Sequence, residues 1–162
     1  MKKLIIFLVG IPASGKSTFC DQYKDIQNAK IVSRDDIRSA FDWQISEDNV
    51  THEFNMKLRH YVTDDTTNVI IIDNTNVRQK YITEIMNFCN RYNDNCKYFM
   101  KIFNVDYEIC IERNSKRTGH RFVPANVMDR MYTNFKLFMK DVNKFAKDNN
   151  IQFLTDVNND GY

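Results

Sequence analysis

The sequence predicts a three-layer α/β fold built on a mostly parallel sheet of four or five strands. Short apolar runs alternate along the chain with segments whose apolar residues recur at helical spacing. The runs within residues 4–9 and 68–73 have unbroken apolar centres, as strands buried on both faces require. A glycine-containing stretch at 10–18 joins the first strand to the first helix, where parallel α/β sheets bind their ligands.

The bulk composition is that of one globular domain, which we expect to span residues 1–162. The chain is 43% hydrophobic and 27% charged, and its net charge of +2 neither requires nor excludes a polyanionic partner. Its four cysteines form no C-x-x-C pair, so we expect free thiols and a cytoplasmic location. A basic start followed by six apolar residues has no cleavage site, and no apolar run approaches transmembrane length. We therefore expect neither a leader nor a membrane contact.

The first half of the chain has clear element boundaries. We expect the first strand over residues 1–9 and a short second strand over 30–32. Ser33 precedes Asp36 by three residues, which resembles a capping box at the start of a helix. Ser46 is expected to cap a longer helix in the same way.

The second half repeats the alternation. A basic segment interrupts it at 113–123, and we expect this segment to form a lid. Pro124 suits the first turn of one long helix with an apolar stripe that continues to Phe145. The further elements we expect are strands over 68–73, 96–105 and 151–154, and a polar tail over 156–162.

The stretch from Gly10 to Thr18 matches the phosphate-loop pattern G-x-x-x-x-G-K-S/T. Its glycines allow backbone N–H groups to surround a polyphosphate at a helix N-terminus. Lysine can reach the β- and γ-phosphates, and the serine hydroxyl can bind Mg²⁺. A turn that matches the pattern by chance is the alternative, and the flanking strand and helix argue against it. We expect ATP contacts from Gly10, Ala13, Ser14, Gly15, Lys16, Ser17 and Thr18.

Residues Arg34 to Arg38 follow the second strand, where a small kinase places the phosphoryl acceptor. A positioned aspartate can take the proton of an acceptor hydroxyl, and Asp35 is the candidate base. The neighbouring Asp36 leaves open which carboxylate is the base and which only stabilises the helix N-terminus. Arg38, one turn further, is either a bidentate ligand for an acceptor phosphate or a solvated arginine.

Asp73 ends the third strand, at the position from which a carboxylate can bind Mg²⁺ through water or orient Ser17. A loop-capping aspartate is the alternative reading. Asn74, Thr75 and Asn76 suit either contacts to the substrate or an ordinary turn.

The basic lid carries Arg113 and Arg117, whose spacing of four places them on one helix face. Cationic groups over bound ATP would neutralise charge on the transferring phosphoryl, and closure would exclude water. A solvated basic helix end is the alternative.

These residues together resemble the kinase domain of the phage-type polynucleotide 5′-hydroxyl kinases. The matching segments follow the family's order across almost the whole chain, and those at 34–38 and 113–117 are the most specific. They are Gly10–Thr18, Arg34–Arg38, Asp73–Asn76, Arg113–Arg117 and Val123-Pro124.

The resemblance implies transfer of the ATP γ-phosphate to the 5′-hydroxyl end of DNA or RNA, with Mg²⁺ as cofactor. It implies Lys16 on ATP, Asp35 as general base, Arg38 on the acceptor phosphate, and Arg117 and Arg113 on the ATP phosphates. The acceptor would be bound by Arg34, Asp36, Arg38, Asn74, Thr75 and Asn76.

The sequence departs from the phage archetype in two places. The archetype has Asp-Thr-Asn after the third strand, whereas Asn74 here separates Asp73 from Thr75. The archetype also continues into a 3′-phosphatase, and this sequence contains no D-x-D-x-T/V motif. We therefore expect kinase activity without phosphatase activity. A small-metabolite kinase and a nucleotide-binding switch are the alternative functions.

Overall fold

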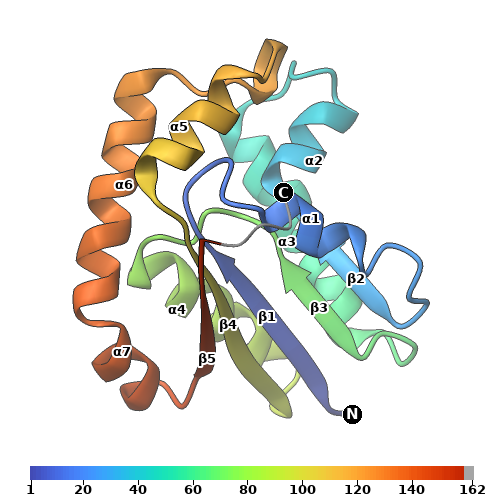
Figure 1. Ribbon diagram of the computed structural model, residues 1–162. Coiled ribbons are helices and arrows are strands. Elements are labelled where there is room, and N and C mark those ends of the chain that lie inside the picture. Colours follow the sequence, from blue (N-terminus) through green and yellow to red (C-terminus); the bar gives the residue numbers. More distant parts are fainter. Residues whose placement is uncertain (159–162) are drawn as a thin grey trace.

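Five parallel strands form one sheet with the spatial order β2-β3-β1-β4-β5 (Figure 1). The computed structural model describes residues 1–158. The observed sheet confirms the predicted parallel α/β fold and supplies the fifth strand. The strands are β1 Lys3–Val9, β2 Ala29–Val32, β3 Val69–Ile72, β4 Cys96–Asn104 and β5 Gln152–Val157.

Helices connect successive strands, and two of them begin where the sequence predicts a cap. The hydroxyl of Ser33 accepts a hydrogen bond from the backbone N–H of Asp36 at 3.2 Å, and Ser46 accepts one from Asn49 at 3.2 Å. The helices are α1 Lys16–Asp21, α2 Arg34–Ala40, α3 Glu47–Thr63, α4 Gln79–Tyr92, α5 Tyr107–Ser115, the 3₁₀ turn η1 Gly119–Arg121, α6 Ala125–Lys140 and α7 Val142–Asp148.

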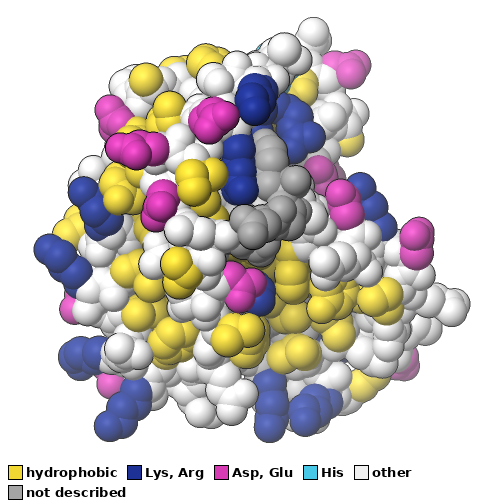
Figure 2. Space-filling model, in the orientation of Figure 1, with side chains coloured by type: hydrophobic (Ala, Val, Ile, Leu, Met, Phe, Trp, Pro, Cys, Tyr) yellow, Lys and Arg dark blue, Asp and Glu magenta, His cyan; other side chains and the backbone are white. Residues whose placement is uncertain are grey.

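The two faces of the sheet are covered unequally. Alternate residues of β1, such as Phe7, face the main apolar core, which α3, α4, α6 and α7 complete. The residues between them, such as Leu8, face a smaller cluster that includes Cys20 of α1. Within residues 1–158, no helix other than α1 contributes to this cluster, and Leu154 of β5 is 53% exposed on the same face. Figure 2 shows apolar side chains over the lower part of these strands.

Two predicted elements differ from those observed. The long helix predicted to reach Phe145 is interrupted at Asp141, where ψ is 9° and α6 gives way to α7. Strand β5 continues to Val157, because Asp156 forms an ion pair with Lys101 at 2.7 Å and the strand pairs with β4 throughout. The predicted polar tail is therefore wrong at its first two residues, and its part at 159–162 lies outside the described residues.

Helix α3 offers a direct test of the main core. Leu58 is fully buried, while Met56 on the same helix is 56% exposed. We expect Leu58→Ala to lower the free energy of unfolding by about 2–5 kcal/mol, because it leaves a cavity. We expect Met56→Ala to change it by less than about 0.5 kcal/mol. Urea unfolding of both variants measures this difference, and equal effects would contradict the packing described here.

Candidate active site

The phosphate loop lies between the end of β1 and the start of α1, at the carboxyl edge of the sheet. A Cβ added to Gly10 would lie 2.6 Å from the Ser14 hydroxyl oxygen and 3.2 Å from the Phe103 Cβ, so only glycine fits there. Ala13 and Gly15 both have positive φ, at 65° and 103°. This backbone turns its N–H groups inward to form a concave anion site.

Lys16 lies against this loop in the free chain. Its ammonium donates hydrogen bonds to the carbonyl oxygens of Gly10 at 2.7 Å and Ile11 at 2.8 Å. Burial lowers the pKa of Lys16 from its ordinary value to about 8, and the nearby Asp73 carboxylate opposes that shift. A bound polyphosphate would replace the carbonyl partners with anionic oxygens and favour the charged lysine.

Oxygen donors suited to Mg²⁺ lie beside Lys16. Asp73 directly follows β3, and burial raises the pKa of its carboxyl group while Lys16 and a hydrogen bond with Cys20 oppose the rise. Ser17 in the first turn of α1 is exposed. A hydroxyl and a carboxylate are the hard ligands that Mg²⁺ uses together with phosphates and water. Residues 1–158 contain no group of three or more His, Cys, Asp or Glu side chains able to form an all-protein metal site.

An ion-pair network on α2 and α3, called the acceptor side below, contains three residues expected from the sequence to act on the acceptor, Arg34, Asp35 and Arg38. Arg38 donates to Asp35 at 2.6 Å and to both carboxylate oxygens of Glu47, at 2.8 and 2.9 Å. Arg34 reaches Glu47 at 3.0 Å and Thr51 at 3.0 Å. The hydrogen bonds from Arg38 lower the pKa of Glu47 to about 2, so Glu47 stays anionic.

Glu47 is the network member that the sequence does not reveal. It lies in the first turn of α3, nine residues beyond Arg38. In the sequence it is indistinguishable from an ordinary acidic residue at a helix N-terminus. Its contacts with the guanidinium groups of Arg34 and Arg38 form only when α2 and α3 pack together.

The loop after β3 connects the phosphate loop to the acceptor side. The Asn74 side-chain oxygen accepts from the Arg34 backbone N–H at 3.1 Å, and the Thr75 carbonyl accepts from Gly10 N–H at 3.0 Å. Asn76 differs from the substrate contact expected from sequence. It is buried, with φ 51°, and its amide donates to the carbonyls of Leu8 and Ile72. We therefore assign Asn76 to holding the ends of β1 and β3.

The basic lid residues lie over the phosphate loop. Arg113 donates to the Ala13 carbonyl at 3.4 Å, and the positive charge of Arg117 contributes to the lowered pKa of Lys16. The predicted shared helix face is wrong in detail, because α5 ends at Ser115 and Arg117 lies just beyond it. Figure 2 shows Lys and Arg side chains gathered near the end of α5, facing the region of α2.

Asn114 closes the lid segment at its base. This buried side chain donates to the Val123 carbonyl at 2.8 Å and accepts from the Val123 N–H at 3.0 Å. The two bonds join the end of α5 to the residue before Pro124. In the sequence Asn114 is one polar residue in a basic run, so no pattern indicated that it would be buried and bonded to Val123.

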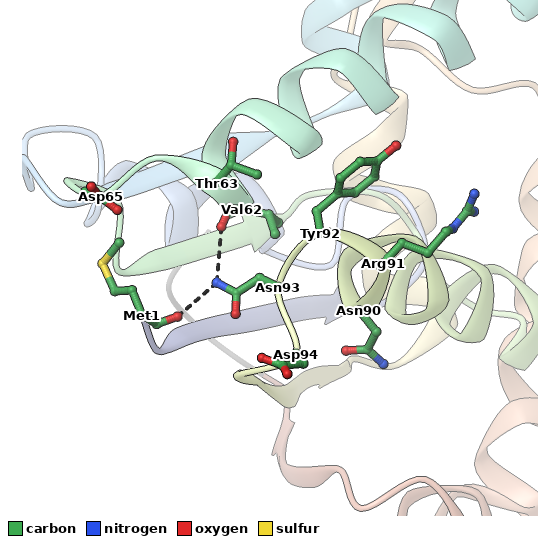
Figure 3. Close-up of a pocket in the computed structure, with 9 residues that line it drawn as sticks. All are labelled: Met1, Val62, Thr63, Asp65, Asn90, Arg91, Tyr92, Asn93 and Asp94. Atoms are coloured by element: carbon green, nitrogen blue, oxygen red, sulfur yellow. Dashed lines mark hydrogen bonds between the residues drawn. The ribbon is translucent and has the colours of Figure 1, made fainter.

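A pocket of about 540 Å³ lies at the opposite, amino edge of the sheet (Figure 3). The Asn93 amide there donates to the carbonyls of Met1 at 2.9 Å and Val62 at 3.2 Å. These bonds fasten the chain start to α3, and the pocket lies away from the strand ends at which parallel sheets bind ligands. Its lining residues are Met1, Val62, Thr63, Asp65, Asn90, Arg91, Tyr92, Asn93 and Asp94.

Comparison with known proteins agrees with this geometry. The family model described as an AAA domain matches residues 5–138, which include the phosphate loop, the acceptor side and the lid. The chain belongs to this AAA domain family. Its architecture is that of a P-loop kinase domain. Within residues 1–158, no helix is both long enough and apolar enough to cross a membrane.

Solved structures of the same architecture include proteins of different kinds. A chain of a Pnkp1/Rnl/Hen1 RNA repair complex is 26% identical, with a TM-score of 0.72 over 86% of this AAA-domain chain and 46% of that one. A fungal RNA kinase is 17% identical, with a TM-score of 0.60 over 83% of this chain and 65% of the kinase chain. A sugar kinase from Janibacter sp. is 13% identical, with a TM-score of 0.53 over 97% of this chain and 86% of the sugar kinase chain. The last two show the fold alone, and this chain spans about half the length of the first.

The pKa of Lys16 generates a testable pH dependence. The anionic phosphates of ATP should raise this pKa above its free value of about 8. Binding then takes up a proton, and affinity should fall as pH rises through 8, by up to about tenfold per pH unit. Calorimetry of a non-hydrolysable ATP analogue from pH 7 to 9.5, in buffers of different ionisation enthalpy, measures the uptake. Lys16→Ala should bind weakly without proton uptake above pH 8, and equal uptake in this variant would contradict the assignment.

The Asn114 contacts predict a second effect. We expect Asn114→Ala to leave the Val123 N–H and carbonyl without their partner and to lower stability by about 1–3 kcal/mol. The lid segment should open locally, so limited proteolysis should cut within 115–122 faster than in the parent chain. Ser115→Ala, at the exposed neighbouring position, is the matched control and should leave the cleavage rate unchanged. Equal rates in all three chains would show that Asn114 does not secure the lid.

Proposed function

We propose that this chain is an ATP-dependent polynucleotide 5′-hydroxyl kinase that acts on the ends of DNA or RNA. The observation that carries the proposal is the Asp35–Arg38 pair on one turn of α2. It places a carboxylate beside a guanidinium group whose present partners are carboxylate oxygens. An acceptor with a phosphate near its reacting hydroxyl would use both groups. The 26% identity to a chain of an RNA repair complex supports this choice of acceptor.

The reaction assigns each residue a role. The Asp35 carboxylate takes the proton of the 5′-hydroxyl while the hydroxyl oxygen bonds to the γ-phosphorus. The bond from that phosphorus to the β–γ bridging oxygen breaks, and ADP is released. Arg38 exchanges its carboxylate partners for the acceptor phosphate, which fixes the hydroxyl beside Asp35. Arg34 and the loop at 74–75 border this acceptor side.

The donor side has its own set of groups. Lys16 and the loop N–H groups bind the β- and γ-phosphates, while Arg113 and Arg117 approach them from the lid. Ser17 and Asp73 would hold Mg²⁺, Asp73 through a water molecule, and the ion supplies positive charge that neutralises the phosphates when it is bound. Lid closure excludes water, the competing acceptor.

The primary experiment compares two oligonucleotides. The protein is incubated with Mg²⁺, γ-labelled ATP and a strand bearing either a 5′-hydroxyl or a 5′-phosphate. We expect label on the first strand alone. Absence of label on any DNA or RNA strand, with ATP still bound, would overturn the proposal and favour a small-metabolite kinase.

The Asp35→Asn variant tests the general base. We expect it to lower kcat about 10²- to 10⁴-fold, because proton transfer is lost, while ATP affinity is retained. Asp48→Asn, an exposed carboxylate in the first turn of α3, is the matched control. A kcat loss in Asp36→Asn but not in Asp35→Asn would move the role to the neighbouring residue. Retained activity in both would favour a binding switch.

A further inference from the structure

One aromatic pair bridges the lid and the acceptor side. Trp43, in the connection between α2 and α3, stacks on His120 of η1 with ring centroids 4.6 Å apart and planes inclined by 10°. The pair joins the segment after α5 to the connection between α2 and α3, and both segments lie beyond the carboxyl edge of the sheet (Figure 1). Neither ring has a role in the proposed reaction.

The backbone holds Trp43 in an unfavourable conformation. Asp42 and Trp43 are consecutive non-glycine residues with φ of 53° and 60°. The left-handed region is disfavoured for residues with a Cβ, and strain of this kind concentrates at ligand clamps. The Trp43 N–H donates to the Arg38 carbonyl at 2.7 Å, which fixes the turn directly onto the helix that carries the acceptor-side arginine.

The two rings differ in how firmly they are placed. Trp43 is half-buried, whereas His120 is exposed on a short 3₁₀ turn whose first residue, Gly119, has a positive φ. His120 is thus the ring that can leave. Imidazole is a planar heteroaromatic ring, and a nucleobase presents the same kind of surface to an indole.

We propose that the Trp43 ring is a stacking platform for the terminal nucleobase of the acceptor strand, and that His120 occupies this platform in the free chain. The inference rests on the proposed polynucleotide acceptor. Because the Trp43 N–H is bonded to the Arg38 carbonyl, an acceptor phosphate on Arg38 would bring the neighbouring base close to the Trp43 turn. Base and lid histidine then compete for one ring face. Stacking uses the face that every base has, so the platform favours no particular base.

The first test uses the fact that Trp43 is the only tryptophan in the chain. Its fluorescence is followed during titration with a 5′-hydroxyl oligonucleotide, beside a strand whose 5′ nucleotide lacks only its base. We expect quenching by the complete strand, and about tenfold weaker binding with little quenching for the abasic one. Equal affinity and equal quenching would overturn the platform.

Variants separate the platform from a simple lid contact. In a binding assay with labelled strands, Trp43→Ala should bind the complete and abasic strands equally, and Trp43→Phe should keep most of the difference. His120→Ala should tighten binding of the complete strand several-fold, and should have no such effect in the Trp43→Ala background. Weaker binding in His120→Ala would show that the stack only closes the lid, and would overturn the competition.

A control and the primary assay keep the failures apart. Tyr92→Ala removes a partly exposed aromatic ring at the opposite edge of the sheet and should alter neither affinity nor quenching. If the parent chain phosphorylates neither strand, the proposed function fails and this inference fails with it. If the parent chain phosphorylates the complete and the abasic strands with equal KM, and Trp43→Ala leaves both KM values unchanged, the platform is wrong and the proposed function stands.

Discussion

The close approach of Gly10 to the end of β4 is the constraint on which the site depends. With no side chain at Gly10, the turn after β1 packs directly on Phe103, and Ser14 and Gly15 fold back over it. The concave loop is then held against the edge of the sheet. A methyl group at this position would push the loop away from the strand end and displace Lys16 from its place.

The cations of the site are held by oxygen atoms before any phosphate arrives. Lys16 contacts two carbonyls, Arg113 contacts a third, and Arg38 contacts two carboxylates. Binding of an anionic ligand would therefore exchange one set of oxygen partners for another, with little rearrangement of the side chains. Such preorganisation reduces the entropy lost on binding and keeps the long side chains pointing into the site.

Local chemistry explains what the sequence predicted. The phosphate loop, the helix caps at Ser33 and Ser46, and the parallel sheet depend on neighbouring residues or on strand composition, and all are observed. Glu47 and Asn114 were missed because their partners are reached only through packing or loop closure. The helix break at Asp141 was missed because the apolar stripe continues across it, so the periodicity of the sequence shows no interruption.

The position of β1 at the centre of the sheet has a consequence during synthesis. Its neighbours β3 and β4 lie at 69–72 and 96–104, so β1 leaves the ribosome long before either strand exists. At about 5–20 residues per second, the wait for β4 lasts roughly 5–20 seconds. Until β3 is made, the apolar residues of β1 have no strand to pair with. Until β4 is made, the phosphate-loop motif lacks the Phe103 strand end on which Gly10 packs. The nucleotide site is thus encoded first and completed late.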